Sequence, residues 1–103
     1  MKQLQKLANI TQFNFVSTPV KGEEITLFIE GMLSDPAWEI QRESVDINNP
    51  KNKISVKIWI KRDPNVMAAQ VTKKFVKEVK ITFPHAGKWI IQVNDKNLEA
   101  LVE

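Results

Sequence analysis

Few side chains in this chain combine the type and the spacing that chemistry requires. The sequence contains no cysteine and a single histidine, His85, which lies between Pro84 and Gly87. The lack of cysteine excludes disulfides, thiolate zinc sites, iron–sulfur clusters and thiol nucleophiles. A histidine without a second histidine or a cysteine nearby is expected in a turn or surface role, because a metal needs several ligands and a catalytic imidazole needs a partner.

Carboxylates and hydroxyls do not form a catalytic pattern either. The aspartates lie in or near turn-rich segments, where they commonly accept backbone hydrogen bonds; they are Asp35, Asp46, Asp63 and Asp95. Their spacing gives no reason to pair two of them as acid and base. No serine has a Gly-x-Ser-x-Gly context, and no glycine-rich phosphate loop is present. We therefore expect a protein that is not an enzyme, with no metal, cofactor or small-molecule substrate.

Length and composition predict one domain over residues 1–103. The chain is 43% hydrophobic and 26% charged with a net charge of +3, which is typical of an ordinary soluble domain and only weak evidence for an acidic partner. Residues 1–10 are expected to lead into the first strand or to form two helical turns. They lack the apolar run of a signal peptide, and no membrane span is predicted. The cellular compartment is not determined by the sequence. The cytoplasm is slightly favoured, unless a leader peptide was removed from the chain.

Alternation of apolar and polar residues dominates the rest of the chain and predicts β-strands. It is clearest in residues 25–29, 54–60, 79–83 and 89–93 and weaker in 11–17, 38–47 and 98–102. In 38–47 the apolar positions change from even to odd, as a bulge or strand break would produce. Turn-rich segments separate the strands. The sequence thus predicts an all-β sandwich of about seven antiparallel strands in two sheets.

The same alternation divides the aromatic residues between the core and the surface. Trp38 and Trp89 belong to inward-facing series and are expected to fill the core. Trp59 lies between Lys57 and Lys61 in the outward phase of its strand, and Phe28 occupies the outward phase of another. We predict that Phe28, Lys57, Trp59 and Lys61 form one exposed binding face. The alternative is that these side chains only cover the outer surface of the sandwich.

Several short motifs resemble those of a known β-sandwich family. They are Gly31, Pro36-Ala37-Trp38, Ala68-Ala69-Gln70-Val71, Phe75, and Gly87 through Asn94, which is similar to Gly-x-Tyr-x-Val-x-Val-Asn. The chain resembles, over roughly residues 23–101, the small bacterial and archaeal immunoglobulin-like domains that are often attached to lipoproteins. This resemblance implies an immunoglobulin-like sandwich that acts as an appended, non-catalytic module.

Two departures from that family concern its cysteine pair and its tyrosine. Ala37 and Ala68 stand where the resemblance implies two cysteines, so a disulfide that contributes about 2–4 kcal/mol elsewhere is replaced by packing here. If the resemblance holds, Ala37 and Ala68 are adjacent in the fold. Trp89 stands at the family's tyrosine position. Its indole N–H is still able to donate one hydrogen bond, although its ring needs more room.

Two classes of function remain open at this stage. The first is a non-catalytic protein-binding or structural module, whose partner is another protein or a second copy joined through an unprotected edge strand. The alternative is a small β-barrel that binds single-stranded nucleic acid on a face of aromatic and basic residues. A closed five-stranded barrel would favour this alternative, and seven strands in two sheets would favour the module. A third option is a protease inhibitor that presents the loop 62–69 to its protease. No residue in the sequence specifically favours this option.

Overall fold

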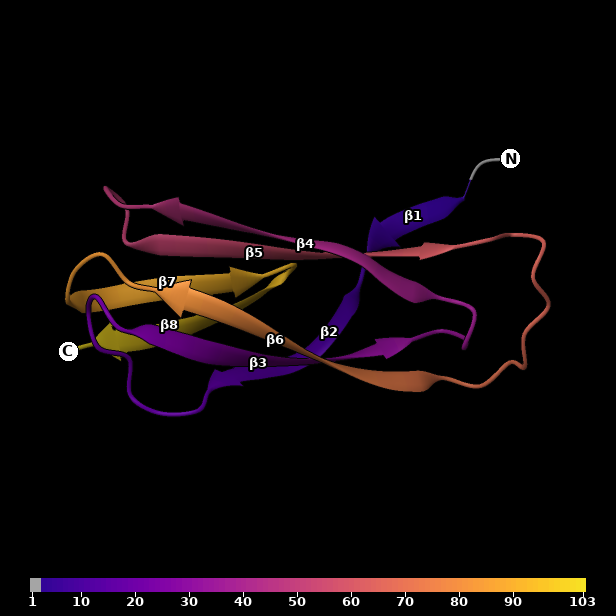
Figure 1. Cartoon of the computed structure of the whole chain (residues 1–103), viewed down its shortest axis with the longest axis horizontal. Coiled ribbons are helices and arrows are strands. Elements are labelled where there is room, and N and C mark those ends of the chain that lie inside the picture. Colours follow the sequence, from indigo (N-terminus) through magenta and orange to yellow (C-terminus); the bar gives the residue numbers. More distant parts are fainter. Residues whose placement is uncertain (1–2) are drawn as a thin grey trace.

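The computed structural model describes residues 3–103 and is built from strands alone (Figure 1). Met1 and Lys2, which belong to the segment 1–10 discussed above, lie outside the described residues. The eight strands are β1 Leu4–Leu7, β2 Asn9–Phe15, β3 Glu24–Leu33, β4 Glu39–Asn48, β5 Lys53–Arg62, β6 Lys73–Thr82, β7 Gly87–Val93 and β8 Lys96–Val102. The predicted all-β sandwich is confirmed. One strand more than expected is present, because Leu4–Leu7 forms a strand and not a helical turn.

The strands form a five-stranded sheet and a three-stranded sheet, the latter in the order β2-β3-β6. In the five-stranded sheet, β4 pairs along one edge of β5, while β7 and β1 share the other edge. The β5–β7 pair is parallel, which corrects the expectation of antiparallel strands throughout. The reason is connectivity: β6 lies in the other sheet, so the chain returns as β7 in the same direction as β5.

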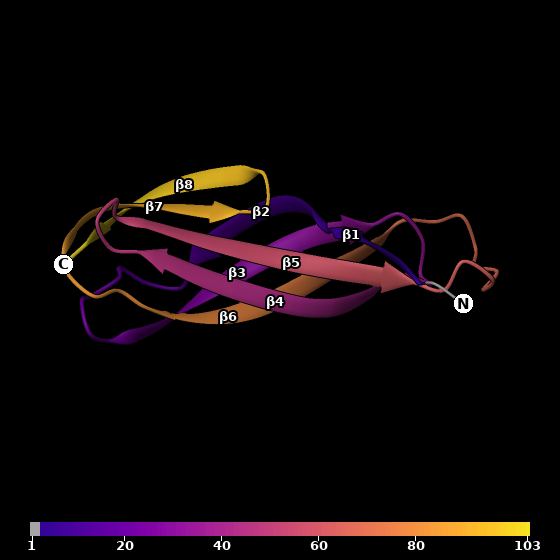
Figure 2. The same cartoon turned by 90° about the horizontal axis from the view of Figure 1, so that it is seen from above.

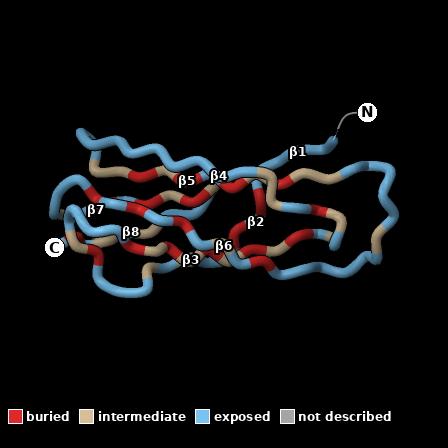
Figure 3. Tube along the Cα trace, viewed as in Figure 1, coloured by how far each residue is buried: buried red, intermediate tan, exposed pale blue. Residues whose placement is uncertain are grey.

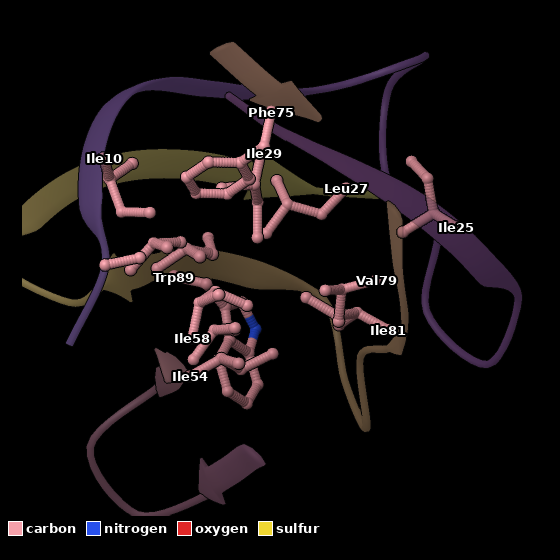
Figure 4. Packing of buried hydrophobic residues seen from close by; sticks show 14 of the residues in the cluster. Ile10, Ile25, Leu27, Ile29, Ile54, Ile58, Phe75, Val79, Ile81 and Trp89 are labelled. Atoms are coloured by element: carbon pink, nitrogen blue, oxygen red, sulfur yellow. The ribbon is translucent and has the colours of Figure 1, made fainter. Parts of the chain in front are cut away.

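The inward positions of the alternating segments meet between the two sheets and form one core (Figure 3). Leu27 and Ile29 of β3 face Ile54 and Ile58 of β5 and Trp89 of β7 across the sandwich (Figure 4). Trp38 and Trp89 are 8% and 0% exposed, so their predicted core positions are confirmed. The inward phases predicted for 25–29, 54–60, 79–83 and 89–93 are confirmed as well.

The phase change in residues 38–47 is a register shift within one strand. The pairing of β4 with β5 slips between Ile40 and Arg42, as expected for a bulge. Beyond the shift, Val45 and Ile47 take the inward phase opposite Val56 and Ile54. They remain 40% and 42% exposed, because β4 is the outermost strand of its sheet.

Asn94 closes the gap that β7 and β1 leave along the shared edge of β5. Its Oδ1 accepts the Ile58 backbone N–H at 2.9 Å, and its Nδ2 donates to the carbonyls of Ala8 at 2.7 Å and Ile58 at 3.3 Å. The side chain therefore continues the hydrogen-bond ladder where the register of β7 ends at Val56 and that of β1 begins at Trp59. Asn94 also has φ of +52°, a conformation that asparagine tolerates better than most residues.

We predict that Asn94→Ala lowers the free energy of unfolding by about 2–4 kcal/mol, from the unpaired Ile58 N–H and the cost of alanine at positive φ. Asn94→Gly should avoid the cost of alanine at positive φ but still leave the Ile58 N–H unpaired, so it should recover only part of the lost stability. A matched control is Asn52→Gly, because Asn52 has φ of +50° and its side chain donates one exposed hydrogen bond. Urea unfolding followed by circular dichroism measures all three variants. A stability of Asn94→Gly equal to that of the wild type would contradict the bridging role.

Candidate functional site

The outer face of the five-stranded sheet carries a row of three side chains centred on Trp59. Because Ile58 and Ile60 fill the core, Trp59 between them points outward and is only partly buried. Leu7 of β1 lies opposite Trp59 in the register on one side, and Arg42 of β4 lies opposite it on the other. The guanidinium carbon of Arg42 is 4.9 Å from the centroid of the Trp59 ring, a cation–π contact.

The bulge in β4 is what brings Arg42 to this row. Before the register shift Ile40 pairs with Ile60 in the inward phase, and after it Arg42 pairs with Trp59 in the outward phase. Without the extra residue, Arg42 would not share the face of Trp59. Sequence reasoning missed Arg42 and Leu7. The phase change was the available signal for Arg42, while Leu7 belongs to a segment whose pattern is too short to assign.

Charged side chains flank the row, and lysines predominate on β5. Lys57 and Lys61 flank Trp59 on β5, and Lys53 continues the same outward series. None of these three lysines forms an ion pair within residues 3–103. On the outer face of the five-stranded sheet, Lys88 pairs with Glu99 at 3.3 Å. Lys57 is exposed, Lys53 and Lys61 are partly buried, and Glu39 of β4 lies opposite Lys61 in the register. Lys57, Trp59 and Lys61 are brought together as predicted.

Phe28 does not belong to this face. It lies on β3 of the three-stranded sheet, in the outward phase between the buried Leu27 and Ile29. The two sheets pack through their inner faces, so Phe28 and Trp59 lie on opposite outer faces of the sandwich. The prediction of one patch containing both residues is wrong, because alternation separates inside from outside but does not tell which sheet a strand joins.

The outer face around Phe28 also has a different electrostatic character. Lys74 pairs with Glu30 at 3.4 Å, and Lys80 donates to Thr26 Oγ1 at 2.6 Å. The hydrogen bond from Gln12 lowers the pKa of Glu30; burial opposes this and the charge of Lys74 adds to it. Glu30, Lys74, Thr26 and Lys80 are thus engaged with one another, in contrast to the lysines around Trp59.

Ala37 and Ala68 lie in two connections at the same end of the sandwich (Figure 1). Ala37 is in the β3–β4 connection and Ala68 in the β5–β6 connection, and both are partly buried. Their adjacency stays a prediction. The Ala37 N–H donates to Asp35 Oδ1 at 2.8 Å, which places this residue in a tight turn.

Asp35 ties that turn to the end of β5. The Arg62 Nε atom donates to both carboxylate oxygens, at 3.2 and 3.1 Å, in a pair that is mostly shielded from solvent. Burial raises the pKa of Asp35, but the hydrogen bonds from Ala37 and Arg62 and the charge of Arg62 outweigh it, so the pKa lies below its ordinary value. The pair stabilises the loop and is not part of the outer face.

A groove of about 640 Å³ runs beside β1, between residues of both sheets. Its wall includes Lys6, Leu33, Ile60 and Asn94. The Lys6 ammonium lies 4.5 Å from the Trp38 ring centroid, and the Asn94 amide is committed to backbone groups. Lys6 and Asn94 are thus engaged in contacts within the fold. The groove therefore has fewer polar groups available to a ligand than the face around Trp59.

His85 takes the turn position expected for it. Its ring lies 4.9 Å from that of Trp89, and its carbonyl accepts the Trp89 indole N–H at 3.0 Å. Within residues 3–103 no three side chains of histidine, cysteine, aspartate or glutamate are grouped so as to hold a metal ion. Across the same residues, the structure contains no helix with the length and apolar character needed to cross a membrane.

Comparison with known proteins gives one match. Residues 27–102 match the family model of the ORF11 beta-sandwich domain, which covers the chain from the middle of β3 to the end of β8. No curated protein and no solved structure matches the chain.

Proposed function

We propose that this chain, which belongs to the ORF11 beta-sandwich domain family, is a non-catalytic protein-binding or structural module. The observation that carries the proposal is the row of Leu7, Trp59 and Arg42 on the outer face of the five-stranded sheet. Tryptophan and arginine dominate the binding energy of protein interfaces, because both combine a large contact area with directed polar groups. A partly exposed tryptophan stacked by arginine is such an anchor.

The surroundings of the anchor define the partner that it fits. Leu7 is 40% exposed beside Trp59 and extends the apolar centre, while Lys57 and Lys61 supply a basic rim. A protein surface with an apolar centre and an acidic rim is complementary to this arrangement.

The loop between β5 and β6 was the third option considered from the sequence, as the binding loop of a protease inhibitor. It exposes Met67, at 98%, but lies beyond the row at one end of the sandwich.

An immunoglobulin-like relationship is the finer part of the proposal. It is supported by Phe75, which lies opposite Gly31 in the register so that two of the resembling motifs meet, and by the buried Trp89. The parallel β5–β7 pair departs from the all-antiparallel sheets of immunoglobulin domains. The implied attachment to lipoproteins belongs to the resemblance and is part of the same proposal.

A closed five-stranded barrel would have favoured the alternative function. The described strands form two sheets instead. Single-stranded nucleic acid would use the same aromatic and basic residues, Trp59, Lys57 and Lys61. Oligonucleotide binding is therefore one arm of the test and not a second proposal.

We predict that Trp59→Ala abolishes capture of a protein partner that the wild-type domain retains, because the anchor of the row is removed. Immobilised wild type, Trp59→Ala and Phe28→Ala are incubated with an extract of the source organism, and retained proteins are identified by mass spectrometry. Binding is then remeasured with the purified partner. Truncation of an anchor should weaken this affinity by about 30-fold or more.

Phe28→Ala is the matched control, because Phe28 is also aromatic and outward-facing but lies on the opposite sheet. It should bind the purified partner as the wild type does. Equal binding by Trp59→Ala and the wild type would contradict the proposed face. Binding of a mixed-sequence oligonucleotide in low salt that is lost in Trp59→Ala, without a protein partner, would favour the alternative.

A further inference from the structure

The free edge of β4 is the longest unpaired strand edge of the five-stranded sheet. The strand Glu39–Asn48 pairs with β5 alone, and residues 42–48 are all exposed. In Figure 2, β4 runs along one long side of the sandwich beside β6 of the other sheet. Lys77 of β6 reaches Glu43 of β4 at 3.8 Å, but the two strands are not hydrogen-bonded to each other. An unpaired edge of this length is a template for another strand.

Glu43, Val45 and Ile47 of β4 direct their backbone N–H and C=O groups to that edge. The carbonyl of Val56 accepts from the Asn94 N–H at 3.0 Å, and the Ile58 N–H donates to Asn94 Oδ1, so both residues of β5 turn their backbone groups away from β4. Their register partners Val45 and Glu43 must then present their own N–H and C=O groups to the open side. Ile47, two residues further along, has the same orientation.

The two long free edges differ in their protection against pairing. The β6 edge carries lysine at four of its ten positions, 73, 74, 77 and 80, and lysine is a common device that keeps an edge unpaired. The β4 edge has no lysine. It presents Val45 and Ile47, which remain 40% and 42% exposed at the margin of the core. The β6 edge is therefore lysine-rich, whereas the β4 edge has two partly exposed apolar side chains and no lysine.

We propose that β4 pairs antiparallel with β4 of a second copy of this chain, with Val45 opposite Val45. In this register Glu43 lies opposite Ile47, so the backbone groups of all three residues that face the edge are paired. The two Val45 side chains meet at the two-fold axis, and Ile47 of each copy lies diagonally beside Val45 of the other. Both copies keep the same side chains on the same face, as antiparallel pairing about a two-fold axis requires.

Charge complementarity supports the second copy as the occupant. The register places Arg42 diagonally across from Asp46 of the other copy on the outer face, within reach of a long side chain, and the symmetry repeats this pair. The Arg42 guanidinium carbon lies 4.9 Å from the Trp59 ring centroid, and its N–H groups form no ion pair within the described residues; a carboxylate is their strongest partner. The strand is therefore complementary to itself in backbone, apolar and charged groups.

The pairing would join two five-stranded sheets into one continuous sheet and place both Trp59 rows on the same face. It uses the free backbone edge of β4 and shares one residue, Arg42, with the row of Leu7, Trp59 and Arg42. Leu7 lies on the β1 side of Trp59, so Leu7→Ala should weaken binding of a protein partner and leave the dimer intact, and failure of either proposal is distinguishable from failure of the other.

Sedimentation velocity of the whole chain from about 10 μM to 1 mM tests the proposal, because a small interface is expected to bind weakly. The wild type should show a concentration-dependent dimer. Val45→Lys, which adds a charge to the free edge, should raise the dissociation constant by about tenfold or more. Val76→Lys is the matched control, since Val76 is a 54% exposed valine on the lysine-rich β6 and should leave dimerisation unchanged.

A charge exchange tests the register and does not depend on Val45. Arg42→Asp and Asp46→Arg should each dimerise less than the wild type, because each places like charges across the two-fold axis. An equimolar mixture of the two variants should restore dimers, since every carboxylate of the first variant's strand then faces a guanidinium of the second. A wild type that is monomeric at about 1 mM, a Val45→Lys dimer of wild-type affinity, or a mixture no better than its components would overturn the proposal.

Discussion

Trp89→Ala should lower the free energy of unfolding by about 3–5 kcal/mol, the largest effect expected from removing a core side chain of this protein. Trp89 is 0% exposed and lies in the centre of β7. Its ring packs edge-to-face against Phe83 with centroids 5.4 Å apart, and its indole N–H donates to the His85 carbonyl at 3.0 Å. Alanine would leave a cavity between the sheets and an unpaired carbonyl in the turn that precedes β7.

Urea unfolding followed by far-ultraviolet circular dichroism measures this loss without relying on tryptophan fluorescence. Trp89→Phe separates its two components, because it keeps an aromatic ring in the core but removes the hydrogen bond; it should cost about 1–2 kcal/mol. The outward-facing Trp59 provides a control of the same residue type. Trp59→Ala should cost about 1 kcal/mol or less, the value of an exposed cation–π contact. An unchanged unfolding midpoint for Trp89→Ala would contradict its place in the core.

Gly31→Ala should destabilise the fold by about 3 kcal/mol or more, although it adds a single methyl group. A Cβ atom at Gly31 would overlap the backbone carbonyl oxygen of Asn9 and the ring atoms Cε1 and Cζ of Phe75. Phe75 lies opposite Gly31 in the β3–β6 register and Asn9 begins the neighbouring β2. The methyl group therefore cannot be accommodated without moving a backbone segment as well as a buried ring.

The double variant Gly31→Ala with Phe75→Leu identifies which contact dominates. Removal of the ring should recover only part of the stability, because the Asn9 carbonyl belongs to the backbone and still blocks the site. Gly22→Ala is the control, since Gly22 has φ of +77° and nothing within 4 Å of the point where a Cβ atom would lie. It should cost about 1 kcal/mol from backbone conformation alone. Equal losses for the two glycine variants would show that packing at Gly31 is not decisive.

Most of the candidate face was predictable from local pattern, and its limits have a physical cause. The alternation of residues 54–60 placed Lys57, Trp59 and Lys61 together, because successive side chains of one strand must point to opposite faces. Arg42 required the bulge to be placed to within one residue. Leu7 required a four-residue strand whose side chains are all exposed, and such a strand has no hydrophobic pattern to reveal it.

The error over Phe28 has a different origin. Its outward phase was inferred from the same alternation as that of Trp59, and both phases are confirmed. Whether two outward residues share a surface depends on which strands are neighbours. Neighbours are set by long-range pairing, here β3 with β2 and β6 but β5 with β4, β1 and β7. No periodicity within one strand contains that information.

The sequence alone determined that this protein is an all-β sandwich, which residues of its four most regular strands face the core, and which chemistries the missing cysteines exclude. These properties follow from period-two alternation and composition, which act locally or on the chain as a whole. Only the tertiary structure decided that β7 runs parallel to β5, that Asn94 bridges Ala8 and Ile58, and that Gly31 lies beneath Phe75. Each depends on segments far apart in the sequence that meet in one place, and a packed core accepts only one such arrangement.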